Sequence, residues 1–382
     1  MSIRKILVTG GAGYIGSHLV DVLVARSYDV TVLDNLEPQV HRSGTWPPYV
    51  NSRATYVHGD VRDRNVLQQL VLKSDAIVHF AAAVSVGQSM YQIDRYVAVN
   101  TGATGLLLDI LVNERHTVNK VIVASSVGVY GEGAYACVSC GPRHCGLRSR
   151  SQLAAHDWEL KCPTCERNLQ PRPTSEDKPL YRDNIYAMTK FHQEEMALLV
   201  GKTYGIPVVA PRFFNVYGPR QSLSNPYAGV AAIFLGRLLN DRPPVIFEDG
   251  GQLRDFVSIH DVVDGLVLML ETSGADFLPV NLGSGNRISI LEIARTLARL
   301  LGKQIDPTVL NTGRRFDIRH CVADITRAEA TLGYRPTVSF DTGMAELIEW
   351  ARQDPGMAVD LFDTALEELK EKRLLVEESS KP

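Results

Sequence analysis

The chain has no long hydrophobic segment and no excess of charge of either sign. No run reaches the roughly 18 uninterrupted apolar residues that a membrane-spanning helix requires. Its 40 basic and 43 acidic residues give a formal net charge of -3, which argues against binding to nucleic acid or to a membrane surface. A charged and then apolar leader is also lacking at the start of the sequence, so we expect a cytoplasmic protein.

Cysteine is scarce, since only six are present in 382 residues, and five of the six lie within residues 137–165. In a reducing compartment such clustering favours a metal site over disulfides. Two Cys-x-x-Cys pairs with 21 residues between them are close to the spacing of a zinc ribbon, in which four thiolates bind the metal. We therefore expect a structural zinc on Cys137, Cys140, Cys162 and Cys165. Cys145 and His144 are alternative ligands, and free thiols or a redox pair are the alternatives to a metal.

Residues 3–34 have the pattern of a strand, a glycine-rich turn, a helix and a second strand. Residues 9–16 read T-G-G-A-G-Y-I-G, between an apolar run and a segment of helical periodicity. We expect Gly10 to turn the chain, Gly13 to let backbone N–H groups approach a pyrophosphate, and Gly16 to let the helix pack on the strand. A glycine-rich turn without a ligand is the alternative.

The acidic residue after the second strand indicates which cofactor is bound. Asp34 lies eighteen residues after Gly16, where a carboxylate binds the ribose hydroxyls of a dinucleotide. A carboxylate repels a 2′-phosphate, and no arginine follows closely. The pattern therefore predicts NAD rather than NADP.

Further apolar runs alternate with helical patterns, which indicates a parallel, doubly wound α/β sheet of the Rossmann type. These runs are 54–57, 76–80, 120–124 and 207–213. From residue 221 onward the pattern changes to shorter helices and loops, so a smaller α/β domain is expected. We divide the chain into a dinucleotide-binding domain at 1–217, a substrate domain at 218–354 and a C-terminal helical tail at 355–382.

Ligands bind at the carboxyl ends of such strands, and hydroxyl residues are found there. Ser125 and Ser126 follow the run 120–124, and Tyr186 and Lys190 form Y-x-x-x-K on an expected helix, where positions i and i+4 share one face. An ammonium beside a phenol lowers a pKa of about 10 toward neutrality. Tyr186 can then act as a base, with Ser126 bonded to the same substrate oxygen. A surface tyrosine with a solvated lysine, and a serine turn, are the structural alternatives.

Together these features resemble the extended short-chain dehydrogenases/reductases, and within them the nucleotide-sugar epimerases and dehydratases. The resemblance covers about residues 3–350, apart from one insertion. It rests on the glycine-rich turn, Asp34-Asn35, Gly59-Asp60-Val61, His79-Phe80-Ala81-Ala82, Asn100, Ser125-Ser126, Val129-Tyr130-Gly131, Tyr186 with Lys190, R-F-F-N-V-Y-G-P at 212–219, R-D-F-V at 254–257 and N-L-G-S-G at 281–285.

The resemblance implies a role for each matching residue. The expected catalytic residues are Ser126, Tyr186 and Lys190. The expected cofactor contacts are Gly10, Gly13, Tyr14, Ile15, Gly16, Asp34, Asn35, Asp60, Val61, Ala81, Ala82, Ala83, Asn100, Ser125, Tyr186 and Lys190. The expected contacts with a nucleoside-diphosphate sugar are Ser126, Asn215, Arg254, Arg314 and Asp317.

Two arginines suit a diphosphate because each guanidinium can make paired, charged hydrogen bonds. Whether Arg314 or its neighbour Arg315 turns inward is left open by the sequence, and a solvated pair of arginines is the alternative. Phe316 stands where similar proteins have a glycine, so this loop is expected to differ.

The resemblance also implies the reaction, in which a sugar hydroxyl, usually at C4, is first oxidised by NAD. Similar dehydratases carry an Asp-Glu pair after the active-site hydroxyl residue, whereas this chain has Val127-Gly128. Without a second acid/base pair, the 4-keto sugar can only take its hydride back after turning over, which is 4-epimerisation. A 4-ketoreductase, a 4,6-dehydratase and a non-enzymatic NAD-sensing regulator are the alternatives.

Within the family, the chain most resembles dTDP-L-rhamnose 4-epimerases, which interconvert dTDP-L-rhamnose and dTDP-6-deoxy-L-talose. UDP-galactose 4-epimerases carry a lysine at the position of Val84, which disfavours UDP-galactose. A UDP-hexose or UDP-uronate stays open. The resemblance further implies a homodimer that pairs the helices expected at 103–113 and 187–200.

An insertion at 132–180 carries the four paired cysteines. It joins the serine-bearing strand end to the tyrosine helix, so we expect it beside the sugar pocket as a lid or specificity element, with a passive surface decoration as the alternative. Its basic residues are not interleaved with stacking aromatics, which argues against a nucleic-acid module.

The tail has the pattern of an amphipathic helix at 358–376. Acids and lysines lie opposite its apolar stripe, so we expect a helix docked on the protein and not a membrane anchor. The stripe consists of Leu361, Phe362, Ala365, Leu366 and Leu369.

Overall fold

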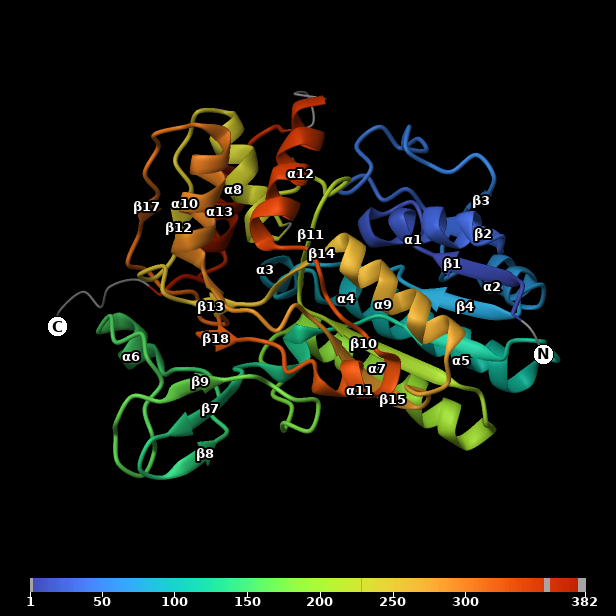
Figure 1. The fold of residues 1–382 in the computed structure, drawn as a ribbon, viewed down its shortest axis with the longest axis horizontal. Coiled ribbons are helices and arrows are strands. Elements are labelled where there is room, and N and C mark those ends of the chain that lie inside the picture. Colours follow the sequence, from blue (N-terminus) through green and yellow to red (C-terminus); the bar gives the residue numbers. More distant parts are fainter. Residues whose placement is uncertain (1–2, 228, 354–357, 377–382) are drawn as a thin grey trace.

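A parallel sheet of eight strands forms the centre of the computed structural model, which describes residues 3–227, 229–353 and 358–376 (Figure 1). The strand order is β15-β10-β5-β4-β1-β2-β3, with the short β6 beside β10. The predicted Rossmann-type sheet is therefore confirmed. Its strands are β1 (Lys5–Thr9), β2 (Asp29–Asp34), β3 (Thr55–His58), β4 (Ala76–His79), β5 (Lys120–Val123), β6 (Ser125–Ser126), β10 (Val208–Phe213) and β15 (Leu278–Leu282).

Helices cover both faces of the sheet, because parallel strands are apolar on both sides. On one face, the core contains residues of α1 (Tyr14–Ala25), α9 (Ile259–Glu271) and α11 (Thr326–Leu332). On the other face, it contains residues of α2 (Arg64–Val71), α5 (Ala103–Asn113) and α7 (Ile185–Tyr204). The side chain of Asn184 caps the start of α7, and Gly205 ends the helix in the left-handed conformation. Because the helix begins at Ile185, the Y-x-x-x-K motif lies on its first turns.

One helical stretch, Ile93–Asn113, is the single described helix whose length and hydropathy would suffice to cross a membrane. It joins α4 (Ile93–Tyr96), a π-helical segment (Val97–Gly102) and α5, and it follows the short α3 (Val86–Ser89). Its residues Leu107 and Ile110 are fully buried in the core beside the sheet. We therefore interpret the stretch as a core helix of the α/β fold.

A smaller α/β region follows the sheet strand β10. Its apolar core joins α8 (Val230–Leu239), α10 (Ile290–Leu301) and α12 (Phe340–Gln353). Short strands accompany these helices (Figure 1). They are β11 (Asn215–Tyr217) with β14 (Phe256–Ser258), β12 (Val245–Ile246) with β17 (Thr308–Val309), and β13 (Leu253–Arg254) with both β16 (Ile288–Ser289) and β18 (His320–Cys321).

The insertion forms a separate lobe below the smaller region in Figure 1. It follows a 3-10 turn (Val127–Tyr130) and contains a three-stranded antiparallel sheet and one short helix. These elements are β7 (Ala134–Cys137), β8 (Gly141–Arg143), β9 (Gln170–Arg172) and α6 (Arg150–Ala154).

The C-terminal tail contains α13 (Phe362–Glu371), which is shorter than the helix predicted at 358–376. Phe362, Ala365 and Leu369 are buried, as the predicted stripe requires, whereas Leu361 is exposed. Residues 355–357 and 377–382 of the predicted tail, and residue 354 of the predicted substrate domain, lie outside the described part of the chain.

Candidate active site

One large cavity lies between the carboxyl ends of the sheet strands and the smaller region, with a volume of about 1400 Å³. A site for one small ligand usually measures roughly 300–1,000 Å³, so this cavity has room for two ligands. Both regions contribute to its lining, as Gly10, Tyr186 and Arg254 illustrate.

The glycines after β1 form a turn without room for side chains. A Cβ atom on Gly10, whose φ is +71°, would lie 2.7 Å from the backbone nitrogen of Ala81. A Cβ on Gly16 would lie 2.4 Å from the carbonyl oxygen of Gly10, and one on Gly13 would lie 3.3 Å from the same oxygen. The turn thus brings the start of α1, with its unpaired N–H groups, to the cavity, where they can bind a pyrophosphate.

Asp34 ends β2 and borders the cavity beside this turn. Its Oδ2 accepts the N–H of Ala12 at 3.0 Å and its Oδ1 accepts the N–H of Leu36 at 2.9 Å. These bonds fix the carboxylate, and each oxygen can accept a further hydrogen bond from a ribose hydroxyl. The Asp34 carboxylate therefore fits the ribose of NAD, and the glycine turn fits its pyrophosphate.

Asp60 and Asn35 lie further along the same edge of the sheet and also border the cavity. Asp60 accepts a forked pair of hydrogen bonds from Arg62, at 2.9 and 2.7 Å, and one from Asn35 at 3.2 Å. The bond from Arg62 lowers the pKa of Asp60 to about 2. Because this fork is occupied by Asp60, Arg62 is not poised to bind a 2′-phosphate.

Asn100 lies one layer behind the cavity wall and is fully buried. Its Oδ1 accepts the N–H of Ala83 at 2.8 Å, and its Nδ2 donates to the oxygens of Ala83 and Thr189, both at 3.0 Å. Asn100 thus holds the Ala83 backbone, and although it is not among the described residues that line the cavity, its contact with the cofactor stays a prediction. The other predicted cofactor residues that border the cavity are Tyr14, Ile15, Val61, Ala81, Ala82, Ala83 and Ser125.

Ser126, Tyr186 and Lys190 line the same cavity. Ser126 lies beside the phenol of Tyr186 and favours its ionised form. Lys190, on the next turn of α7, donates from Nζ to the carbonyl oxygen of Ala124 at 3.0 Å. The fold therefore brings together the three residues predicted to be catalytic, from β6 and α7.

Burial shifts the pKa values of both Tyr186 and Lys190. It raises the pKa of Tyr186 to about 12, although Ser126 acts in the opposite direction. It lowers the pKa of Lys190 to about 7. The expected lowering of the tyrosine pKa is therefore not found, because burial disfavours the phenolate.

A buried ion pair behind the catalytic wall was missed by the sequence analysis. Arg212 on β10 pairs with Glu194 on α7 and donates to the Tyr130 hydroxyl at 2.9 Å. Glu194 also accepts from Ser125 Oγ at 2.5 Å, which ties the serine-bearing β6 to α7. The available signal was the spacing, since Glu194 lies eight residues after Tyr186 and so repeats the i, i+4 face.

Asp183 is a second residue that the sequence pattern did not single out. It borders the cavity three residues before Tyr186, and its Oδ2 lies 2.7 Å from the position of a Cβ on Gly131. This oxygen is buried without a hydrogen bond to any described residue, and burial raises the pKa of the carboxyl group. Asp183 can therefore accept a hydrogen bond from a substrate hydroxyl.

Asn215 and Arg254 border the cavity from the short strands of the smaller region. The Nδ2 of Asn215 donates to the carbonyl oxygen of Asp255 at 2.9 Å. The guanidinium of Arg254 donates to the carbonyl oxygens of Ile318 at 2.7 Å and Arg319 at 2.9 Å. These bonds hold the Arg254 side chain in place at the cavity.

Arg314 turns toward the cavity and Arg315 is exposed, which answers the question that the sequence left open. Arg314 forms a forked pair with Asp317, at 2.6 and 2.9 Å, so these two predicted substrate contacts bind each other. Its guanidinium lies 4.6 Å from the ring centre of Phe247 and 5.7 Å from that of Phe316. A diphosphate therefore meets a guanidinium that is already oriented by a carboxylate and two rings.

The sequence matches the NAD dependent epimerase/dehydratase family over residues 6–149 and 163–283. It is 36% identical over 358 residues to the dTDP-L-rhamnose 4-epimerase of Burkholderia thailandensis, a match that covers 92% of this chain and 96% of that protein. The chain belongs to the NAD-dependent epimerase/dehydratase family.

Solved structures of 4-epimerases have the same fold. The UDP-glucose 4-epimerase of Thermotoga maritima, solved with UDP-glucose, has a TM-score of 0.75 at 28% identity, over 92% of this chain and 99% of that one. The UDP-glucuronic acid 4-epimerase of Bacillus cereus, in complex with UDP-glucuronic acid and NAD, has a TM-score of 0.74 at 28% identity, with the same coverage. This family member is accordingly an enzyme, an isomerase, and its cofactor is NAD.

In this epimerase-family chain, the four paired cysteines form one cluster in the insertion. The four sulfur atoms lie within 4.8 Å of one another, and the Sγ atoms of Cys137 and Cys165 are 3.5 Å apart. A tetrahedral zinc with Zn–S bonds of about 2.3 Å requires sulfur atoms at about 3.8 Å from one another. Cys145 packs against the cluster but is not a member of it.

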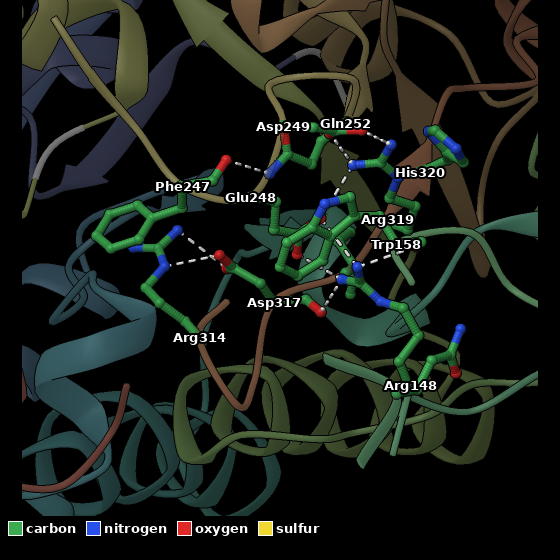
Figure 2. Close-up of polar contacts among 12 residues, drawn as sticks. Arg148, Trp158, Phe247, Glu248, Asp249, Gln252, Arg314, Asp317, Arg319 and His320 are labelled. Atoms are coloured by element: carbon green, nitrogen blue, oxygen red, sulfur yellow. Dashed lines mark hydrogen bonds and ion pairs between the residues drawn. The ribbon is translucent and has the colours of Figure 1, made fainter. Parts of the chain in front are cut away.

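The insertion docks on the smaller region through buried charges, as Figure 2 shows. Arg148 donates to Glu248 at 2.9 and 2.7 Å, and Arg319 donates to the same carboxylate at 3.0 Å. Arg148 also reaches the carbonyl oxygen of Asp317 at 3.2 Å. Arg148 of the insertion is thus bonded to Asp317, and Asp317 in turn orients Arg314. The insertion is therefore linked to two predicted substrate contacts.

The insertion does not line the cavity as the expected lid would, whereas its expected role as a specificity element stays a prediction. Residues 132–180 are all described, and none of them is among the residues that line the cavity. The physical reason is the Arg148–Glu248–Arg319 network, which fixes the lobe against the outer side of the smaller region. The cavity is instead bordered by α13 of the tail, through Phe362, Ala365, Leu366 and Leu369.

Proposed function

We propose that this enzyme is an NAD-dependent nucleotide-sugar 4-epimerase that acts on a dTDP- or UDP-hexose. The dTDP-L-rhamnose/dTDP-6-deoxy-L-talose pair is the favoured substrate. The observation that carries the proposal is the continuity of one cavity from the glycine turn, past Ser126 and Tyr186, to Arg254 and Arg314. NAD and a nucleoside-diphosphate sugar can therefore bind end to end, with the sugar ring between the phenol and the arginines.

Each residue of the set has one task in this reaction. Tyr186 removes the proton of the sugar 4-hydroxyl and later returns it, while Ser126 hydrogen-bonds to the same oxygen. Lys190, oriented by the carbonyl of Ala124, supplies positive charge beside the phenol. NAD, held by the glycine turn and Asp34, would supply the hydride acceptor for C4 and, in its oxidised form, positive charge that favours the phenolate. Arg254 and Arg314 hold the diphosphate during the rotation.

The wall next to Ser126 favours epimerisation over dehydration. Val127 and Gly128 border the cavity directly after the serine, and neither side chain transfers a proton. Asp183 is a single carboxyl group, and dehydration of the 4-keto sugar needs both an acid and a base. A 4-ketoreductase would use the same residues but would release its cofactor after each turnover.

The choice of the dTDP-6-deoxyhexose is supported by two observations. The Burkholderia relative with 36% identity over 92% of this chain is named a dTDP-L-rhamnose 4-epimerase. Val84, at the position of the lysine of UDP-galactose epimerases, borders the cavity and is 55% exposed. An apolar side chain at this place suits the methyl group of a 6-deoxy sugar.

The test is an NMR assay of purified protein with a panel of dTDP- and UDP-sugars and no added cofactor. We expect the C4 epimer of dTDP-L-rhamnose to form, and one NAD per active site to be released when the protein is denatured. Formation of a 4-keto-6-deoxy sugar would identify a dehydratase. Turnover that consumes added NADH stoichiometrically would identify a ketoreductase, and absence of turnover with the whole panel would favour the NAD-sensing regulator.

We further propose that Cys137, Cys140, Cys162 and Cys165 bind a structural zinc. Four thiolates leave no open coordination position, so a catalytic role for this metal is disfavoured. The cluster packs on Tyr135, Leu160 and Leu169, a core too small to fold the lobe without further stabilisation.

The remaining proposals concern the whole chain. We retain the division into 1–217, 218–354 and 355–382, a cytoplasmic location, and a homodimer that pairs α5 and α7 with the same helices of a second copy. The dimer is supported by apolar residues exposed along these helices, of which Leu199 on α7 is 67% exposed and Val97, just before α5, 45%.

A further inference from the structure

The tail helix α13 forms one wall of the active-site cavity. The residues that line it are Phe362, Ala365, Leu366 and Leu369, an i, i+3, i+4, i+7 stripe. Ten residues of α-helix span ~15 Å, so α13 runs along a considerable length of the cavity. The family motifs assign no function to this segment, which lies after the last of them.

The two ends of α13 contact different parts of the protein. At its start, the Phe362 ring lies 5.0 Å from the guanidinium of Arg237 on α8, and Arg237 pairs with Asp363 at 2.9 Å. At its other end, Leu369 Cδ2 lies 3.2 Å from the position of a Cβ on Gly87, in the short α3 that follows Ala83 and Val84. The helix therefore bridges the smaller region and the edge of the sheet across the cavity.

A carboxylate on α13 is held by tyrosines from both sides of this bridge. Glu368 accepts a hydrogen bond from Tyr91 Oη at 2.6 Å and another from the hydroxyl of Tyr227. Tyr91 lies between α3 and α4, whereas Tyr227 lies in the segment before α8. Burial, with Glu368 beside it, raises the pKa of Tyr227 to about 12, so this hydroxyl stays a donor at neutral pH.

The segment after α13 continues along the loop that carries Arg314. The N–H of Arg315 donates to the carbonyl oxygen of Leu374 at 3.3 Å, and the N–H of Val376 donates to that of Gly313 at 2.8 Å. Phe316, from the same loop, meets Leu369 beside Gly87, at 3.7 Å from the same Cβ position. Leu369 therefore borders the cavity beside the loop that carries Arg314 and beside Gly87.

We propose that α13 is a substrate-contacting cover, in which Leu366 and Leu369 determine specificity for the sugar and Glu368 is a positioning residue that fixes the helix through Tyr91 and Tyr227. The proposal rests on the proposed function and deepens it. The apolar stripe favours a sugar with a methyl group at C6, because a buried 6-hydroxyl or 6-carboxylate would lose its hydrogen bonds to water without gaining a partner there.

The specificity claim is tested with Leu366→Asn, in the full-length protein with NAD bound. We expect the ratio of kcat/KM for a dTDP-6-deoxyhexose to that for the matching dTDP-hexose to fall at least tenfold. The matched control is Leu361→Asn, because Leu361 is exposed at the start of the same helix and is not among the described residues that line the cavity. An unchanged ratio in folded Leu366→Asn protein would overturn this claim.

The positioning claim is tested with Glu368→Ala and Glu368→Gln. We expect KM for the nucleotide sugar to rise about five- to twentyfold in the alanine variant with little change in kcat, and to recover in part with glutamine, which retains one acceptor oxygen. Glu367→Ala removes an exposed carboxylate of the same helix and serves as the control, with a KM within twofold of the wild type. A merely structural role would lower the melting temperature and leave KM unchanged.

Calorimetric titration with dTDP and UDP separates failure of the cover from failure of the proposed function. Weaker nucleotide binding in Glu368→Ala would support the proposal that α13 covers the substrate, even if no epimer forms with any sugar. Tighter binding in this variant would mean that α13 competes with the substrate for the same space, and equal binding would mean that α13 does not contact it. Either result would overturn the proposal, whatever the reaction catalysed.

Discussion

At the scale of single residues, the environment of Tyr186 differs most from what the sequence pattern suggested. A lysine four residues away was expected to lower the pKa of the phenol, but burial raises it to about 12 and brings Lys190 itself to about 7. In the proposed reaction, proton removal by Tyr186 would therefore depend on the positive charge of the oxidised cofactor as well as on Lys190. Spacing along a helix predicts that two groups are neighbours, but it does not predict how much water surrounds them.

Removal of the tyrosine hydroxyl tests its role directly. We expect Tyr186→Phe to lower kcat by about 10²–10⁴-fold, the usual contribution of a general acid/base, while the bound NAD is retained. Turnover is measured by NMR and bound NAD by absorbance after denaturation. Tyr204→Phe, on the exposed end of the same helix, is the control and should keep full activity. A Tyr186→Phe variant with normal turnover would contradict the assignment.

Arg314 and Arg315 form a natural matched pair because one lines the cavity and the other is exposed. A hydrogen bond to a charged group contributes about 1.5–3 kcal/mol, so we expect Arg314→Ala to raise KM roughly ten- to a hundredfold. Loss of Arg314 also leaves Asp317 uncompensated beside the diphosphate. Arg315→Ala should change KM by less than twofold, and similar effects of the two substitutions would refute the orientation of this loop.

At the scale of the elements, β4 ends on a histidine that the fold keeps neutral. His79 bonds to the hydroxyls of Thr9 at 2.8 Å and Thr104 at 3.2 Å, and burial, with the nearby charge of Lys190, lowers its pKa to about 3. Between pH 6.5 and 3, the unfolded chain binds a proton that the folded chain excludes. The unfolding free energy must therefore fall as the pH falls, by up to about 1.4 kcal/mol per pH unit from this group.

Denaturant titrations between pH 4 and 7 measure this dependence. His79→Gln should flatten the curve of unfolding free energy against pH in that interval, although it also lowers stability at pH 7. His192→Gln, which replaces an exposed histidine on α7, is the control and should leave the slope as in the wild type. Parallel curves for the wild type and His79→Gln would show that His79 does not titrate as proposed.

The insertion is the element whose stability should depend most on a metal. We expect one zinc per chain by mass spectrometry, and loss of this zinc in Cys137→Ser, with earlier melting of the lobe. Cys145→Ser replaces the cysteine that packs beside the cluster and should keep the metal. Zinc-free protein from a fully reduced preparation, with unchanged stability of Cys137→Ser, would remove the proposal.

At the scale of the whole molecule, the outer surface of α7 bears on oligomeric state. Leu199 is 67% exposed, which is unusual for a leucine on a central helix and is expected of a dimer interface. We expect Leu199→Glu to convert a dimer to a monomer in light scattering coupled to gel filtration, because a carboxylate without a partner opposes burial. Leu72→Glu, at the exposed end of α2, is the control. A wild-type monomer would contradict the homodimer.

Regular elements and the cofactor turn were predictable from local pattern. The run at 120–124 corresponds to β5 (Lys120–Val123) and the run at 207–213 to β10 (Val208–Phe213), because strands buried on both faces are apolar throughout. Gly10 was predictable because its backbone conformation excludes other residues. The spacing after Tyr186 could have placed Glu194 on the same face of α7, but its pairing with Arg212 was not predictable, since the two residues are brought together only when α7 packs on β10.

The amino-acid sequence by itself determined the Rossmann-type sheet, the use of NAD, the family and the identity of the cysteine cluster, because each depends on residues close together in the chain or on a strict spacing. Tertiary structure alone decided which arginine faces the cavity, where the insertion docks and which part of the C-terminal tail borders the cavity. These features depend on contacts between segments far apart in the sequence, such as Arg148 with Glu248 and Glu368 with Tyr91. Their free energy arises from burial and from hydrogen bonds that exist only after the chain has folded.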